Sequence, residues 1–224
     1  VDIQLLIEDG QKFENNQRLL ELQGPSSSLV AGERITLNVA MHLSGIATST
    51  ALLVSKLSGS NVKLADTRKT TPGLRIFEKY AFICGGGINH RMGLDDAAML
   101  KENHIEWSTG ISESIKILKG NIPWTKKIIV EAETPTQAKE AVEAGADGVL
   151  LDEMPIETIE KLVPELRQLS KTSKSKYVSK NIVIEVSGIN PNNLTDYIFT
   201  GIDLISTSAP ITKSKWLDFS MRFN

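Results

Sequence analysis

The chain has 224 residues, 41% of them hydrophobic and 23% charged, which is the composition of a globular protein that buries a core and excludes a disordered or fibrous chain. Its formal net charge of -2 gives no overall basic field, which argues against nucleic acid as the main partner, so any cationic site must be local. Cys84 is the only cysteine, which excludes an intrachain disulfide and favours a reducing, cytoplasmic setting.

The first quarter of the chain predicts a small lobe followed by a long helix. Short apolar runs separated by DGQ and LQGPSSS predict strands within the first 25 residues, and since Val1 lies inside such a run we expect further residues upstream. Residues 28–57 are helical in character, with an interruption expected at Ser44 and Gly45. We find no apolar stretch near bilayer-spanning length and no secretory leader, and expect no membrane contact.

Strands and helices then alternate along the chain. VKLADT at 62–67 predicts a strand, and KKIIVEAE at 126–133 predicts a buried one. A helix should follow, with Thr134 as N-cap, Pro135 at its first position, Gln137 completing a capping box and Gly145 at its end.

The same alternation continues to the end of the chain. The predicted elements are the strand DGVLLDE, a helix from Pro155 to about Ser170, the polar loop KTSKSKYVSK at 171–180, the strand NIVIEVSG, a short helix in NPNNLTDYIFTG, the strand IDLISTS and an edge strand in the alternating tail WLDFSMRF. Strands that alternate with helices imply parallel βα units, which predicts an α/β barrel or an open α/β sheet.

Polar side chains stand where these apolar strands end. The residues are Glu131, Asp152, Glu185, Ser187 and Ser206, and Arg68 and Lys69 hold the same kind of position after VKLADT. The carboxyl ends of parallel strands form the ligand-binding rim of α/β barrels. Carboxylates and cations together on this rim predict a ligand with anionic groups beside a metal or a hydroxyl-rich centre.

Each of these signals also has a purely structural interpretation. TRKTTPGLR can be a charged surface turn, the glycines of CGGGINHR can end a helix, and LKENH can be a polar helix end. His90 can be a satisfied interior histidine, and Glu185 can pair with a lysine inside a barrel. Glu131 and Asp152 are harder to explain structurally, because an acid that closes a buried strand needs a compensating partner.

Ordered motifs over nearly the whole chain resemble one family. They are ERITLN, LSGIATST, DTRKTTPGLR, EKYAFICGGGINHRMGL, LKENHI, VEAET, EAGADGVLLDE, IEVSGIN, LISTSAP and LDFSMRF. The chain resembles the nicotinate-nucleotide pyrophosphorylase family, also called quinolinate phosphoribosyltransferase. The resemblance implies an α/β barrel of parallel strands (36–208) and a smaller N-terminal α/β sandwich lobe (1–35) that a C-terminal strand (209–224) completes. The family's usual helical beginning would precede Val1.

The resemblance also implies a reaction, in which quinolinate and phosphoribosyl pyrophosphate give nicotinate mononucleotide, pyrophosphate and carbon dioxide with Mg²⁺. It implies a homodimer or higher homo-oligomer in which Arg34 reaches quinolinate in the neighbouring subunit. Within the barrel, Arg68, His90 and Arg91 would hold quinolinate, and arginine suits carboxylates because its planar fork binds them through two hydrogen bonds. The family's motifs also imply that Thr67, which directly precedes Arg68, binds substrate.

The remaining roles concern the sugar donor. Lys69 and Lys101 are expected near the phosphates and the second carboxylate, and Glu131 and Asp152 near the ribose hydroxyls and Mg²⁺. These four would be the catalytic residues. Ser187, Gly188, Ser206 and Ser208 would bind phosphate through hydroxyl and backbone N–H groups.

Four motifs depart from the family's usual pattern. In one, IVE replaces EVE and keeps only the acid Glu131. The other three are these. SGIN replaces SGG, STSAP replaces an S-x-G motif, and LLDE replaces LLDN, which places Glu153 beside Asp152. A phosphoribosyltransferase for another aromatic acid, or a catalytically silent homologue acting as a binding or assembly partner, therefore stays open. The presence of every expected cation and of both carboxylates favours the enzyme.

Overall fold

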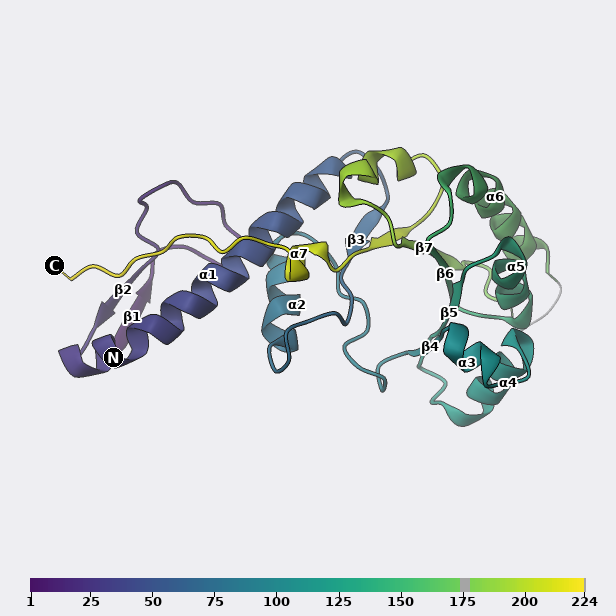
Figure 1. Ribbon diagram of the computed structural model, residues 1–224, viewed down its shortest axis with the longest axis horizontal. Coiled ribbons are helices and arrows are strands. Elements are labelled where there is room, and N and C mark those ends of the chain that lie inside the picture. Colours follow the sequence, from purple (N-terminus) through teal and green to yellow (C-terminus); the bar gives the residue numbers. More distant parts are fainter. Residues whose placement is uncertain (174–177, 224) are drawn as a thin grey trace.

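The computed structural model describes residues 1–173 and 178–223, which form a parallel sheet and a separate small hairpin (Figure 1). The parallel sheet has the strand order β3-β8-β7-β6-β5-β4 over these residues. Its strands are β3 (Lys63–Ala65), β4 (Ala98–Leu100), β5 (Ile128–Ala132), β6 (Gly148–Asp152), β7 (Val183–Ser187) and β8 (Leu204–Ser206). The hairpin pairs β1 (Asp2–Leu5) with β2 (Leu20–Gln23) in antiparallel register.

Helices connect and cover the strands of the parallel sheet. They are α1 (Ser26–Lys56), α2 (Arg75–Cys84), α3 (Glu102–Glu106), α4 (Ile111–Asn121), α5 (Pro135–Ala144), α6 (Ile156–Thr172), the 3-10 helix η1 (Pro191–Tyr197) and α7 (Ala209–Thr212). Figure 1 shows α5 and α6 on the outer side of a strongly curved sheet. The predicted α/β class is confirmed.

The sheet has the curvature of a barrel, but its edge strands do not pair with each other in the described part of the chain. On one edge, β3 pairs with β8; on the other, β4 pairs with β5. A single parallel bridge from Ala65 to Ile88 extends the β3 edge. The central strands are apolar because both of their faces are covered, as Val149 on β6 and Ile184 on β7 illustrate.

Helix α5 begins and ends at the predicted residues. The backbone N–H of Gln137 donates to Thr134 Oγ1 (3.2 Å), and the backbone N–H of Thr134 donates to Gln137 Oε1 (3.0 Å), which forms the capping box. Gly145 ends the helix in the left-handed region with a φ of 90°.

The interruption predicted at Ser44 and Gly45 is wrong, because α1 is continuous over 31 residues. Gly45 has a packing role: a Cβ at this position would lie 2.3 Å from the backbone oxygen of Lys215. The expectation that no stretch reaches bilayer-spanning length is also wrong, since α1 is long and apolar enough to cross a membrane by its length and composition. In the fold, α1 packs against α2 and α7.

The edge strand predicted in the tail is also wrong, since residues 214–223 form no strand. The tail runs along α1 towards the hairpin (Figure 1), where the ring centroids of Phe219 and Phe13 are 5.7 Å apart. The backbone N–H of Leu217 donates to the carbonyl of Met41 on α1 (3.2 Å), so a helix rather than a strand edge receives the tail.

Two connections near the end of the chain complete the comparison with the predicted elements. The predicted short helix after NIVIEVSG is the 3-10 helix η1, and Asn190 caps it by accepting the backbone N–H of Asn192 (3.0 Å). Of the predicted loop 171–180, the first two residues extend α6, and 174–177 lie outside the described residues.

Candidate active site

A cavity of about 550 Å³ opens at the carboxyl ends of the parallel strands. Every predicted site residue except Arg34 lines it: Thr67, Arg68, Lys69, His90, Arg91, Lys101, Glu131, Asp152, Ser187, Gly188, Ser206 and Ser208. Arg34 lies on α1, with its side chain 74% exposed and 3.7 Å from Glu33. The structure of one chain therefore brings all but one of these residues together.

Several lining residues were not assigned from the sequence. They are Asp66, Met99, Leu150, Glu153, Glu185, Ile189, Pro191, Thr207, Ala209 and Lys213. Asp66 could have been found, because it directly precedes Thr67 at the end of a predicted strand. Lys213 gives no such signal, since it follows α7 and reaches the cavity only through the path of the chain after β8.

Lys101 and Glu131 form an ion pair across the ends of two neighbouring strands. Leu100 on β4 pairs in parallel register with Val130 on β5, so the residues that follow them lie side by side. Lys101 Nζ contacts Glu131 Oε2, with the lysine side chain 44% exposed and the glutamate 14% exposed. The backbone N–H of Lys101 also donates to His104 Nδ1 (3.1 Å), which fixes the start of α3. LKENH is therefore both a helix start and a source of cationic charge.

Asp152 and Ser187 meet at the ends of β6 and β7 through their parallel register. The Ser187 hydroxyl donates to Asp152 Oδ1. Beside them, Glu153 has a φ of 51°, in the left-handed region that bulky residues rarely adopt. Gly188 has a φ of 73°, and a Cβ at this position would lie 2.5 Å from Glu153 Cγ. This tight corner explains why the glycine of SGIN is needed.

His90 and Glu185 face each other at 3.3 Å between Nε2 and Oε2. His90 Nδ1 accepts the backbone N–H of Arg91 (2.7 Å), so a neutral ring carries its proton on Nε2. Neither His90 Nε2 nor Glu185 Oε1 has a hydrogen-bond partner among the described residues, although both atoms are buried. The structural interpretations of a satisfied histidine and of a Glu185–lysine pair are both wrong.

Positive charge also collects around the cavity. Burial lowers the pKa of Arg91, the charge of Arg68 lowers it further, and Glu131 opposes the shift. Arg91 Nη1 donates to the Ala97 carbonyl (2.9 Å). Within the described chain, Arg68 and Lys69 have no ion-pair partner. A bound anion would relieve the repulsion between these cations.

Negative charge collects around the ends of β5 and β6. The charge of Glu102 raises the pKa of Glu133, and burial and the charges of Asp152, Glu131 and Glu153 add to the shift. In the described part of the chain, no three His, Cys, Asp or Glu side chains converge as a metal site. Magnesium is commonly held by one or two carboxylates together with waters and phosphates, and Glu131 and Asp152 fit that donor set.

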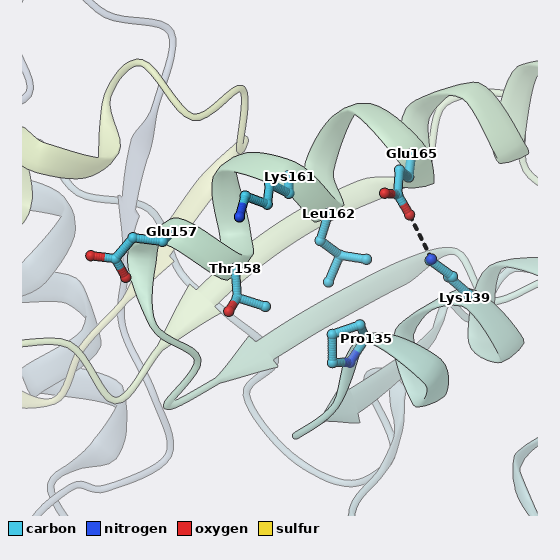
Figure 2. A pocket seen from close by; sticks show the side chains of 7 residues that line it. All are labelled: Pro135, Lys139, Glu157, Thr158, Lys161, Leu162 and Glu165. Carbon is cyan, nitrogen blue, oxygen red and sulfur yellow. Dashed lines mark ion pairs between the residues drawn. The ribbon is translucent and has the colours of Figure 1, made fainter.

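A second, smaller cavity of about 240 Å³ lies between α5 and α6, on the outer side of the sheet. Figure 2 shows its ion pair between Lys139 and Glu165, which are 2.5 Å apart. None of the predicted site residues lines this cavity. The cavity at the strand ends is therefore the candidate active site.

Comparison with known proteins gives one consistent family. The family described as "Quinolinate phosphoribosyl transferase, C-terminal domain" matches residues 46–222, and the corresponding N-terminal domain matches residues 1–44. A relative from Synechocystis, "Probable nicotinate-nucleotide pyrophosphorylase [carboxylating]", is 40% identical over 223 residues, which cover 99% of this chain and 72% of the relative. The human "Nicotinate-nucleotide pyrophosphorylase [carboxylating]" is 35% identical over 217 residues, covering 96% of this chain and 70% of the human protein.

Solved structures agree with these sequence relatives. NadC from Streptococcus pyogenes superposes with a TM-score of 0.88 at 37% identity, covering 99% of this chain and 75% of that one. The nicotinate-nucleotide pyrophosphorylase from Francisella tularensis gives a TM-score of 0.87 at 38% identity, covering 97% of this chain and 73% of that one. The chain belongs to the quinolinate phosphoribosyl transferase family.

Proposed function

We propose that this chain transfers the phosphoribosyl group of phosphoribosyl pyrophosphate to quinolinate, giving nicotinate mononucleotide, pyrophosphate and carbon dioxide, a step of NAD biosynthesis. The observation that carries the proposal is the convergence of Arg68, Lys69, Arg91 and Lys101 on one cavity. Quinolinate has two carboxylates and the sugar donor has several phosphate charges, so their site must gather cations, and Arg68 and Lys69 have no ion-pair partner among the described residues.

Quinolinate is oriented by the arginines and by His90. Arg68 and Arg91 donate to its carboxylates, and the guanidinium geometry favours paired hydrogen bonds that fix the plane of the ring. His90 lines the same cavity, and its Nε2 faces Glu185 Oε2 at 3.3 Å while its Nδ1 accepts the backbone N–H of Arg91. This orientation directs the pyridine nitrogen towards the anomeric carbon of the donor.

The sugar donor occupies the end of the cavity that carries the carboxylates. Ser187, Gly188, Ser206 and Ser208 offer hydroxyl and backbone N–H groups to its 5-phosphate. Glu131 and Asp152 face the ribose and favour the positive charge that grows on the anomeric carbon. Lys69 and Lys101 neutralise the departing pyrophosphate. Magnesium, held by Glu131 and Asp152 with substrate oxygens, supplies further neutralisation of phosphate charge when it is bound.

The bond changes need no protein nucleophile. The pyridine nitrogen attacks the anomeric carbon as the bond to pyrophosphate breaks. The carboxylate next to the cationic ring nitrogen then leaves as carbon dioxide. The ring carbon keeps the electrons of the broken bond, and a proton from water completes the product. Catalysis by this site is therefore mainly electrostatic.

We further propose a homodimer in which Arg34 reaches the neighbouring active site. Support comes from exposed apolar side chains on two adjoining helices, Ile35 and Val39 on α1 with Ile76 and Phe77 on α2. A surface of this kind favours association with another protein chain. A reducing, cytoplasmic compartment stays a prediction based on the single free thiol of Cys84.

The test of the proposed reaction is an assay of pyrophosphate and carbon dioxide release with phosphoribosyl pyrophosphate, magnesium and quinolinate. Equal amounts of both products with quinolinate, and neither product with nicotinate, would support decarboxylating transfer. Binding of both substrates without product release would identify a silent homologue. Turnover of another aromatic acid alone would identify a different transferase.

A further inference from the structure

Helix α2 carries three polar side chains that contact the two loops bearing the cations of the cavity. The first loop, residues 66–74, carries Arg68 and Lys69; the second, residues 88–97, carries His90 and Arg91. We infer that Arg75, Glu78 and Lys79 are positioning residues that hold these loops in the binding geometry before any ligand arrives. The inference rests on the proposed function and concerns how its site is assembled.

Glu78 connects the first loop to the long helix. Its side chain is fully buried, with Oε2 accepting the backbone N–H of Thr71 (2.8 Å). Its other oxygen, Oε1, lies 2.8 Å from His42 Nε2 on α1. One carboxylate therefore connects α2, α1 and the loop that carries Arg68.

Lys79 connects the first loop to the second. It forms an ion pair with Asp66 in which both side chains are fully buried. Asp66 Oδ1 also accepts the backbone N–H of His90 (2.8 Å). The backbone of His90 is thus fixed to the end of β3 through an acid that Lys79 neutralises.

Arg75 bridges the two loops directly. It is the third cation of TRKTTPGLR, and unlike Arg68 and Lys69 it does not line the cavity. Its Nε donates to Thr70 Oγ1 (3.1 Å), and its Nη1 donates to the Met92 carbonyl (3.2 Å). Arg75 therefore holds the two loops together and does not contact the cavity in which a ligand would bind.

These contacts oppose the electrostatic repulsion between the cations of the two loops. Arg68 and Arg91 repel each other in a partly buried setting, which contributes to the lowered pKa of Arg91. Without anchors, the loops would relax apart in the free protein, and ligand binding would have to bring them together again. Removing one partner of a buried polar contact leaves the other partner unpaired and lowers stability, so Arg75, which is only partly buried, separates the two roles better than the fully buried Glu78. Positioning and stability can therefore be separated by substitution.

The experiment compares Glu78→Leu, Arg75→Met and the conservative Glu78→Gln with the wild-type chain. Asp203→Asn is the matched control, because Asp203 also accepts one backbone N–H, from Ile184 (2.8 Å), and one basic side chain, Arg167 (2.7 Å). Asp203 directly precedes the first residue of β8, so it lies at the amino ends of the strands, away from the cavity. The measurements are kcat and KM for both substrates, Tm, and hydrogen exchange of the Lys69 and Thr70 amides.

We expect Glu78→Leu and Arg75→Met to lower kcat/KM by roughly ten- to a hundredfold, since small misplacements of catalytic groups have effects of that size. The amides at Lys69 and Thr70 should exchange faster than in the wild type in both variants, and Tm should fall less for Arg75→Met than for Glu78→Leu, because Arg75 is only partly buried. Glu78→Gln retains an acceptor for the Thr71 N–H and should keep most of the activity. Asp203→Asn should leave both kcat/KM and the exchange of these amides unchanged.

Two kinds of failure are distinguishable. An inactive wild-type chain would overturn the proposed reaction, and the exchange rates would still decide the positioning role. Unchanged exchange and unchanged kcat/KM in both Glu78→Leu and Arg75→Met would overturn the inference. If Glu78→Leu does not fold, Arg75→Met alone decides. A loss of activity that only follows a loss of Tm would assign these residues to stability and overturn the inference as well.

Discussion

Lys101 is the cation whose contribution to activity is easiest to isolate, because it lies at a strand end and, among the described residues, has one charged partner, Glu131. Lys101→Ala removes one positive contact to the phosphates or to the second carboxylate and exposes Glu131 without its partner. Loss of one such electrostatic contact costs about 2 to 4 kcal/mol, so turnover should fall a hundredfold or more. Steady-state kinetics, with folding checked by circular dichroism, measures the effect.

The control for this substitution is Lys116→Ala on the exposed face of α4. Lys116 pairs with Glu113 at 3.4 Å across one helical turn, and such surface pairs contribute little. Its turnover should equal that of the wild type. Near-normal activity of Lys101→Ala would exclude the role assigned to Lys101.

Glu153 has an unfavourable backbone conformation, with a φ of 51°. Asparagine tolerates the left-handed region better than glutamate does, and Asn16 occupies it elsewhere in the chain at a φ of 61°. Glu153→Asn also removes one charge from the acidic cluster that raises the pKa of Glu133. We expect a gain of about 1 kcal/mol, which raises Tm by roughly 2 to 4 °C in a domain of this size.

Thermal unfolding with Glu153→Ala as the comparison tests this account. Alanine keeps the strain of the left-handed conformation while removing the charge, so Glu153→Ala should raise Tm less than Glu153→Asn does. Equal Tm values for the two variants would show that charge, rather than backbone conformation, governs this position.

The crossing of α1 and the tail depends on Gly45, where a Cβ would lie 2.3 Å from the Lys215 oxygen. Gly45→Ala should therefore lower the free energy of unfolding, although alanine is the better helix former by about 1 kcal/mol. Gly32, on the same helix, has nothing within 4 Å of a Cβ. Gly32→Ala should raise Tm. If Gly45→Ala also raised Tm, the tail would not be held against α1 in solution.

The elements that the sequence predicted well have local causes. Thr134, Gln137 and Gly145 determine the ends of α5 through contacts within a few residues, so the pattern alone is sufficient. The tail and Gly45 depend on contacts between distant segments. Alternation in WLDFSMRF resembles a strand, but a strand needs a neighbouring edge, and the tail meets a helix. Gly45 resembles a helix breaker until its crossing partner, Lys215, is known.

The site was predictable wherever it follows strand ends. Glu131, Asp152, Ser187 and Ser206 lie together because parallel strands end at one rim, and Arg68 and Lys69 follow a strand in the same way. The family's motifs added Arg91 and Lys101. The contacts made by Arg75 and Glu185 were not predictable, because charge alone does not show which way a side chain points. Arg75 bridges two loops away from the cavity, and Glu185 faces His90.

The assembly can be tested by mixing two inactive proteins. Subunits of Arg34→Ala and Lys101→Ala can exchange to form hybrid dimers. If Arg34 completes the neighbouring site, each hybrid dimer has one site in which both residues are intact. A random mixture should then recover about a quarter of wild-type turnover, since half of the dimers are hybrids with one working site. Each variant alone should be inactive. No recovery, with exchange verified by mass spectrometry, would place Arg34 outside the neighbouring site.

Helix α1 extends from the hairpin to the parallel sheet as one uninterrupted rod of 31 residues, about 46 Å long at the usual rise per residue. A rod without a break offers no hinge about which the two regions could swing apart. Substrates can reach the cavity at the strand ends without movement of the hairpin relative to the sheet. A flexible glycine insertion midway along α1 would uncouple the two regions and reveal how much turnover needs them to move as one body.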